Sequence, residues 1–322
     1  MESPRACRRR RARASRRRPL LHAVLCVVAM GGVAAGGTVC VTARAHSGSA
    51  AVSSAASPSA TSSAGAGEEA SVEPVTEPSP TAVDRQASLS RAMAAVDVPS
   101  GAQLSAAVLD LGSGASAVYG DAAFDTASIV KVDILAALLL QAQDAGRRLT
   151  ATERAYAAKM IENSDNASAT ALWHAIGRAE GLDAANERFG LTETSGGSGE
   201  LWGLTQTTAA DQLVLLQQVF GEGSKLSAAS RAYVRGLMKG VEADQRWGVS
   251  AAAEGGSWAL KNGWLPRSTT GLWVVNSIGR VTVGSADYLV AVLSKGSVSQ
   301  ARGVSLVEAA AEAAVAGFAS AP

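Results

Sequence analysis

Residues 128–140 read SIVKVDILAALLL, and this run decides the fold that we expect for the chain. Its apolar residues occupy nearly every side of a helix, which is typical of a helix buried in the middle of a domain. Asp125 or Thr126 can cap its N-terminus, and the helix is expected to extend to about Ala145. Lys131 is unusual in this setting, because lysine is rarely buried unless it is paired or used in chemistry.

Strand patterns flank a helical middle. An early hairpin is expected at 104–111 and 116–119, and later strands at 257–262, 272–278 and 288–294. Helices are expected over 152–221, with breaks at 163–166, 181 and 192–199, and again at 228–239 and 304–318. Thr208 to Asp211 resembles a capping box that starts the helix 212–220. This order predicts an α+β fold, an antiparallel five-stranded sheet flanked by helices with an inserted all-helical lobe.

The two ends of the 322-residue chain differ in charge. Ten of its 29 Lys and Arg residues and all three cysteines lie before residue 46. From Asp84 onward, 19 Lys and Arg face 23 Asp and Glu, a formal charge of −4 (19 − 23). The absence of a basic stripe argues against nucleic-acid binding, and the ligand residues are too sparse for a metal site. We expect no cofactor.

Residues 1–45 are expected to be an export signal or membrane anchor. Arginines crowd 5–18, an apolar stretch covers 19–41, and Ala43-Arg44-Ala45 offers a cleavage site. Residues 46–83, rich in Ser, Ala, Pro, Thr and Glu, are expected to be a disordered linker. Residues 84–322 would form one domain, a monomer outside the cell or on the outer face of the cytoplasmic membrane. Membrane contact is expected only through an uncleaved N-terminal segment.

Ser128 and Lys131 lie one helical turn apart, which brings the amine of the lysine over the hydroxyl. Burial disfavours a charged lysine, so Lys131 can accept the proton of Ser128 and activate it as a nucleophile. The alternative is a capping serine beside a solvated lysine.

Ser164-Asp165-Asn166 lies at a break between two expected helices. Such a segment is commonly a turn and helix cap. In a catalytic site, Ser164 would relay a proton between Lys131 and the leaving group, and Asn166 would bond a substrate amide.

Lys261-Asn262-Gly263 is expected to end a strand, and Asn-Gly is by itself a strong turn signal. In a catalytic site, Lys261 would attract a substrate carboxylate, and Gly263 would let an extended substrate pair with the strand edge. The N–H of Trp264 would join that of Ser128 in an oxyanion hole.

Together, in this order and spacing, the three motifs resemble the serine β-lactamase and penicillin-binding protein superfamily, most closely class A β-lactamases. The resemblance covers roughly residues 103–318. It implies the fold predicted above and the roles argued above for the motif residues, namely Ser128, Lys131, Ser164, Asn166 and Lys261.

Three features depart from that family. The first two motifs are only 36 residues apart (128 to 164), which is short for a class A enzyme. Asn262 stands where its members carry threonine or serine, and the segment 194–208 lacks the usual deacylating pattern. Glu200 lies at about the right distance to be that base, with a surface loop residue as the alternative. His174, the one histidine after His46, is expected on a helix surface rather than in a triad.

We therefore expect an exported serine hydrolase that forms an acyl-enzyme through Ser128, with Lys131 as base. Its partner would be a small-molecule β-lactam or a D-Ala-D-Ala-type peptidoglycan stem peptide. The alternatives are a penicillin-binding, D,D-peptidase-like enzyme with slow deacylation, and a non-catalytic peptidoglycan-binding relative.

Overall fold

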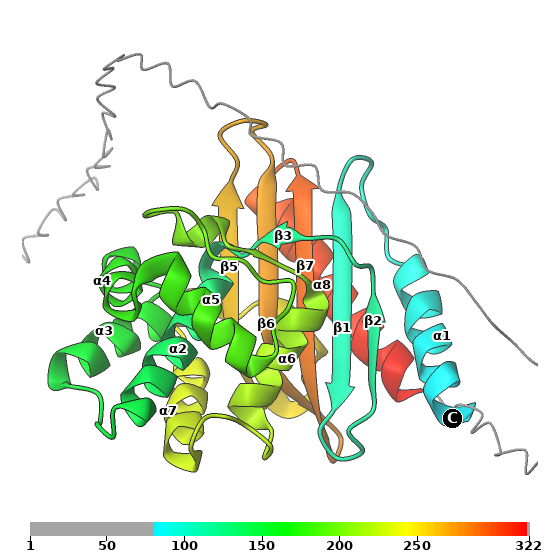
Figure 1. Cartoon of the computed structure of the whole chain (residues 1–322). Helices are drawn as coiled ribbons and strands as arrows, with labels where there is room; N and C mark the ends of the chain where they lie inside the picture. Colours follow the sequence, from blue (N-terminus) through cyan, green and yellow to red (C-terminus); the bar gives the residue numbers. More distant parts are fainter. Residues whose placement is uncertain (1–79, 321–322) are drawn as a thin grey trace, which may run out of the picture. The chain divides into compact units, whose positions relative to one another are not determined.

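The computed structural model describes residues 80–320, which form a five-stranded antiparallel sheet with helices on both faces (Figure 1). The strands lie in the order β2-β1-β7-β6-β5. Their bounds are β1 (Gln103–Asp110), β2 (Ser116–Tyr119), β5 (Trp258–Pro266), β6 (Trp273–Val283) and β7 (Ala286–Ser297). A second, two-stranded sheet pairs β3 (Phe124–Asp125) with β4 (Gln206–Thr207). The predicted α+β fold is confirmed.

Helices from the two ends of the described chain cover one face of the sheet, and helices from its middle cover the other (Figure 1). The first group is α1 (Pro80–Ala94) and α8 (Gln300–Ala319). The second group is α2 (Val130–Asp144), α3 (Ala151–Glu162), α4 (Asn166–Ile176), α5 (Arg178–Phe189), α6 (Ala209–Phe220) and α7 (Ala228–Lys239). No helix among residues 80–320 is long and apolar enough to cross a bilayer.

Successive side chains of a strand point to opposite faces of the sheet, so the core is divided between the two layers of helices. In β1, Ala107 and Leu109 pack with the middle helices, whereas Ala106 and Val108 pack toward α8. All residues of α2 from Val130 to Leu140 are buried. The helix that carries the first motif is therefore central to the domain, as its apolar sequence predicts.

Two predictions about the helices are wrong. Neither Asp125 nor Thr126 caps α2, because a 3₁₀ turn (Ala127–Ile129) leads into the helix without a side-chain cap. Gly181 lies inside α5 and does not break it. An added Cβ would come within 1.7 Å of the Ile176 carbonyl oxygen, so glycine is needed here because α5 packs closely against the end of α4. The break falls instead at Gly177, whose φ of 95° suits the left-handed region.

The third motif also differs from its prediction, because it does not end a strand. Lys261 pairs with Ile278 and Gly263 with Asn276 in the middle of β5, which continues to Pro266. Pairing with β6 thus overrides the local Asn-Gly turn signal.

The N-terminal helix α1 starts at Pro80, inside the segment predicted as linker. Its Gln86 side chain accepts a hydrogen bond from Val118 N (3.1 Å) and donates one to Val118 O (2.8 Å), on the outer edge of β2. The predicted leader (1–45) and most of the linker lie outside the described residues.

Candidate active site

Ser128 lies in the 3₁₀ turn that precedes α2, at a point where the backbone is strained. Ala127 has a φ of 49°, in the region that residues other than glycine seldom adopt. The buried Asn276 of β6 holds this turn, because its Nδ2 donates to Asp125 O (2.9 Å) and Thr126 O (3.0 Å). A rigid strand therefore fixes where Ser128 presents its hydroxyl.

Lys131 is completely buried one turn later. Its Nζ donates to Ser164 O (2.6 Å), Ser164 Oγ (3.1 Å) and Asn166 Oδ1 (2.8 Å). Burial lowers the pKa of Lys131 to about 7, and the negative charge of Asp165 opposes this shift. Three acceptors match the three protons of an ammonium, so one of these bonds must be released before a neutral Lys131 can take a proton from Ser128.

The second motif forms the link between α3 and α4. Ser164 has a φ of 55°, and Asp165 caps α4 by accepting a hydrogen bond from Ser168 N (2.7 Å). That cap fixes the loop, and the bonds donated by the Ser168 side chain and backbone lower the pKa of Asp165. The result is that Ser164 and Asn166 both face Lys131.

Lys261 approaches the same hydroxyl from β5. Its Nζ donates to Ser164 Oγ (3.0 Å) and to Asn262 O (2.9 Å). Complete burial lowers the pKa of Lys261 well below its usual value, and the neighbouring positive charge of Lys131 lowers it further. Ser164 Oγ thus connects two lysines whose charged forms are both disfavoured.

The remaining residues of the third motif bring β5 against the turn that holds Ser128. A Cβ added to Gly263 would lie 2.7 Å from Ser128 N and 2.8 Å from Ile129 N, so only glycine allows this approach. Asn262 points away from the serine, since its Nδ2 donates to Gln245 O (2.8 Å) and Trp247 O (2.9 Å). Asn262, which departs from the family pattern, therefore holds the segment before β5 in place through these two hydrogen bonds.

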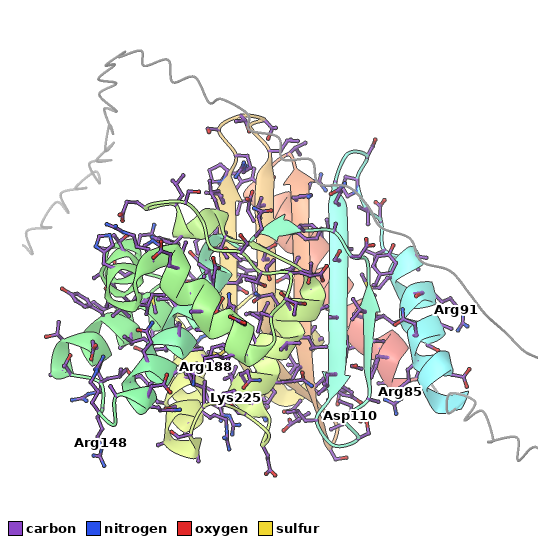
Figure 2. The ribbon with its side chains drawn as sticks, viewed as in Figure 1. Arg85, Arg91, Asp110, Arg148, Arg188 and Lys225 are labelled. Carbon is purple, nitrogen blue, oxygen red and sulfur yellow. The ribbon has the colours of Figure 1, made fainter. Side chains whose placement is uncertain are left out.

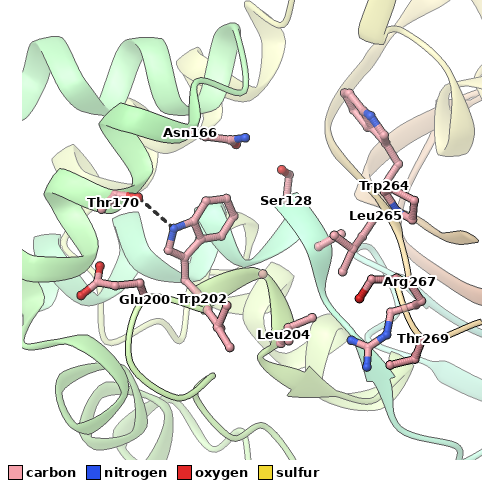
Figure 3. Close-up of a pocket in the computed structure, with 15 residues that line it drawn as sticks. Ser128, Asn166, Thr170, Glu200, Trp202, Leu204, Trp264, Leu265, Arg267 and Thr269 are labelled. Carbon is pink, nitrogen blue, oxygen red and sulfur yellow. Dashed lines mark hydrogen bonds between the residues drawn. The ribbon is translucent and has the colours of Figure 1, made fainter. Parts of the chain in front are cut away.

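A cavity of about 610 Å³ opens beside Ser128 (Figure 3). Of the residues predicted for the site, Ser128, Asn166, Trp264 and Glu200 line it, whereas the two lysines, Ser164 and Gly263 are not among its lining residues. Its lining residues are Ala127, Ser128, Asn166, Thr170, Glu200, Leu201, Trp202, Gly203, Leu204, Trp264, Leu265, Pro266, Arg267, Ser268 and Thr269.

Glu200 lies on the exposed rim of this cavity. Its carboxylate contacts His174 Nε2 (2.6 Å) and Arg178 (2.9 Å), and its side chain is 52% exposed. The hydrogen bond from His174 is the main reason that the pKa of Glu200 is lowered. A carboxylate that is exposed, paired and more acidic than usual is poorly suited to act as a base. His174 lies on the surface of α4, where it was expected.

Two lining residues were missed by the sequence reasoning. The Trp202 ring lines the cavity and donates through Nε1 to Thr170 Oγ1 (3.1 Å; Figure 3). Its centroid lies 5.0 Å from Lys131 Nζ. Arg267 pairs with Asp125 (2.8 Å) on the opposite wall. Neither residue belongs to a motif, and the loop 191–207 has no periodicity that would place Trp202.

Comparison with known proteins bears on the family and the fold of the chain. A family model described as the beta-lactamase enzyme family matches residues 148–318, more than half of the chain. No curated protein matches the sequence.

Solved structures share the fold at low sequence identity. PBP-A is 21% identical with a TM-score of 0.63, over 72% of this chain and 96% of PBP-A. A point mutant of PBP-A, in an acyl-enzyme complex with penicillin G, is 22% identical with a TM-score of 0.62, over 72% and 96% of the two chains. A class A β-lactamase from Bacteroides cellulosilyticus DSM 14838 is 14% identical with a TM-score of 0.62, over 74% and 98%. The family match and the shared fold together show that this chain belongs to the β-lactamase enzyme family.

Proposed function

We propose that this protein is a serine hydrolase that forms an acyl-enzyme through Ser128 on β-lactams or related D-Ala-D-Ala-type peptides. One observation carries the proposal: Lys131, one helical turn after Ser128, and Lys261, from β5, both bond Ser164 Oγ. A buried amine with a pKa of about 7 is neutral in a large fraction of molecules at neutral pH, as a general base requires.

In the proposed acylation, Ser128 Oγ attacks the carbonyl carbon and its proton passes to Lys131 Nζ. The resulting ammonium donates to Ser164 Oγ, and Ser164 passes its own proton to the leaving nitrogen as the C–N bond breaks. Lys261, hydrogen-bonded to Ser164 Oγ, supports this transfer through the same oxygen.

The developing oxyanion requires donors aimed at the carbonyl oxygen. Gly263 approaches Ser128 N closely, and Ser128 and Trp264 both line the cavity, which supports a pair of donors at this point. We propose that these two N–H groups form the oxyanion hole, a device that contributes about 10²–10³-fold to the rate in other enzymes.

Hydrolysis of the acyl-enzyme is proposed to be slow. Glu200 is engaged by His174 and Arg178, and the Trp202 ring lies 5.0 Å from Lys131 Nζ, where we propose that it hinders a hydrolytic water. These contacts favour the penicillin-binding, D,D-peptidase-like alternative over a fast β-lactamase. The arginine-rich leader supports the further proposal that the domain works outside the cytoplasm. We propose a monomer as well, without a feature that tests it.

The test is the intact mass of the full-length protein, followed over time after mixing with penicillin G. We expect an adduct of the mass of the drug in the wild type, and none in Ser128→Ala. An adduct that persists for hours supports slow deacylation, whereas rapid loss with release of hydrolysed drug supports a β-lactamase. Labelling that survives in Ser128→Ala would show that the nucleophile is assigned incorrectly.

A further inference from the structure

A second cavity, of about 540 Å³, lies at the opposite end of α2 from Ser128. It forms between the C-terminal end of α2, the start of α3 and the first turn of α7. Its lining residues are Leu139, Ala142, Gln143, Arg147, Arg148, Leu149, Arg154, Ser227, Ala229, Ser230 and Tyr233. Since α2 spans 15 residues, this cavity is about 20 Å from the serine and separate from the candidate active site.

The charged residues that line this cavity are all positive. Three arginines line it, and no lining residue in the described chain is a carboxylate. Arg147 is neutralised by Glu153, with which it forms two hydrogen bonds of 2.9 and 3.0 Å. None of the ion pairs within residues 80–320 includes Arg148 or Arg154. Two positive charges therefore remain uncompensated beside a concave surface.

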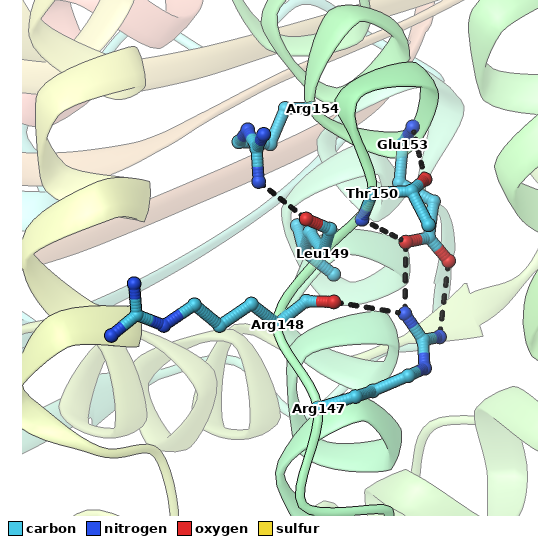
Figure 4. A network of polar contacts seen from close by, with 6 residues as sticks. All are labelled: Arg147, Arg148, Leu149, Thr150, Glu153 and Arg154. Carbon is cyan, nitrogen blue, oxygen red and sulfur yellow. Dashed lines mark hydrogen bonds and ion pairs between the residues drawn. The ribbon is translucent and has the colours of Figure 1, made fainter.

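The orientation of these side chains leaves donors available. Arg148 and Arg154 extend to the same side of Leu149, whereas Arg147 and Glu153 pair on the other side (Figure 4). One guanidinium nitrogen of Arg154 donates to Leu149 O, which leaves its other N–H groups without a partner in the described chain. Figure 2 shows Arg148 at the outer end of the helical lobe, where a ligand can reach it from solvent.

The cavity also has hydroxyl groups and apolar walls. Ser227 and Ser230, at the N-terminal end of α7, line the cavity, but they are already engaged: Ser227 N and Ser230 Oγ donate to Gln143 Oε1 (2.8 and 2.7 Å), and Ser230 N donates to Ser227 Oγ (3.2 Å). The hydroxyl of Tyr233 donates to Arg154 O (3.2 Å), and its ring is half-buried. Leu139, buried in α2, supplies an apolar wall.

We propose that this cavity binds an organic phosphate, with the phosphate between Arg148 and Arg154 and the apolar body against Leu139, Leu149 and Tyr233. Guanidinium groups bind phosphate and carboxylate through paired N–H donors. Phosphate fits better here than a carboxylate, because two arginines border the cavity with N–H groups to spare, and a tetrahedral phosphate offers three acceptor oxygens to them. The site is independent of acylation at Ser128.

The test is titration calorimetry of the full-length protein with phenyl phosphate, inorganic phosphate and benzoate. We expect phenyl phosphate to bind more tightly than either of the other two. Arg148→Gln and Arg154→Gln should each weaken it at least tenfold. Arg91→Gln is the matched control, because it removes one exposed positive charge from α1, far from the cavity lining, and should leave the affinity unchanged.

Three results would overturn the proposal. These are no binding of phenyl phosphate by the wild type at millimolar concentration, equal affinity in all three arginine variants, or benzoate binding as tightly as phenyl phosphate. Arg148 is exposed and makes no ion pair within the described chain, so its replacement is not expected to disturb folding.

Discussion

Replacement of Gly263 by alanine tests whether strand β5 positions the nucleophile. The new Cβ would lie 2.7 Å from Ser128 N, and ordinary contacts begin near 3.4 Å, so the turn must move by about 0.7 Å (3.4 − 2.7). A misplacement of 1 Å at a reacting group costs up to about 10²-fold in rate, so we expect acylation to slow by about 25-fold. Overpacking should also lower the free energy of unfolding by about 1–3 kcal/mol.

The assay is the rate of adduct formation with penicillin G, followed by mass, together with the unfolding midpoint of each variant. Gly279→Ala is the matched control, because its Cβ would lie 2.3 Å from Ala259 O within the same sheet but would not touch the turn that holds Ser128. We expect it to lose stability while its folded molecules acylate at the wild-type rate. Acylation of Gly263→Ala within twofold of wild type would refute the reasoning.

Three further predictions follow from the same site. The acylation rate should rise with pH through about 7, because burial lowers the pKa of Lys131 to about 7 and only the neutral amine accepts a proton; a pH–rate profile that is flat from 5.5 to 8.5 would contradict this. Asn276→Leu should lower the free energy of unfolding by about 2–4 kcal/mol in urea denaturation, since two buried carbonyls, of Asp125 and Thr126, lose their donor. Glu200→Gln should leave the lifetime of the acyl-enzyme unchanged in the mass assay, because Glu200 is exposed and paired; a large slowing of deacylation would assign it as the base.

Much of the fold was predictable because its signals are local. The apolar run of α2, the alternation in β1 and the caps of later helices each lie within a few residues of sequence. Thr208, for example, accepts a hydrogen bond from Asp211 N, as its capping pattern indicates, although α6 begins three residues earlier than predicted. Helix α1 was missed because polar residues and alanine dominate it, so its apolar face is short.

The candidate site was predictable only where motif residues carry it. The spacing of Ser128 and Lys131 suggested direct contact, yet Lys131 bonds the second motif instead, because residues 33 and 35 positions later fold against it. Asn276 and Trp202 reach the site from β6 and from a loop, and no pattern near either residue indicates that role. Such long-range contacts depend on how the sheet and the helical lobe pack, which local sequence does not encode.

The two edges of the main sheet differ in what they offer to another chain. At β2, Gln86 occupies both the N–H and the C=O of Val118, as a neighbouring strand would. An edge that is blocked in this way is a poor template for aggregation or domain swapping. At the other edge, β5 borders the cavity beside Ser128, and we propose that a peptide substrate adds to the sheet there by β-augmentation. On this proposal, the fold directs backbone pairing toward the proposed nucleophile and away from self-association.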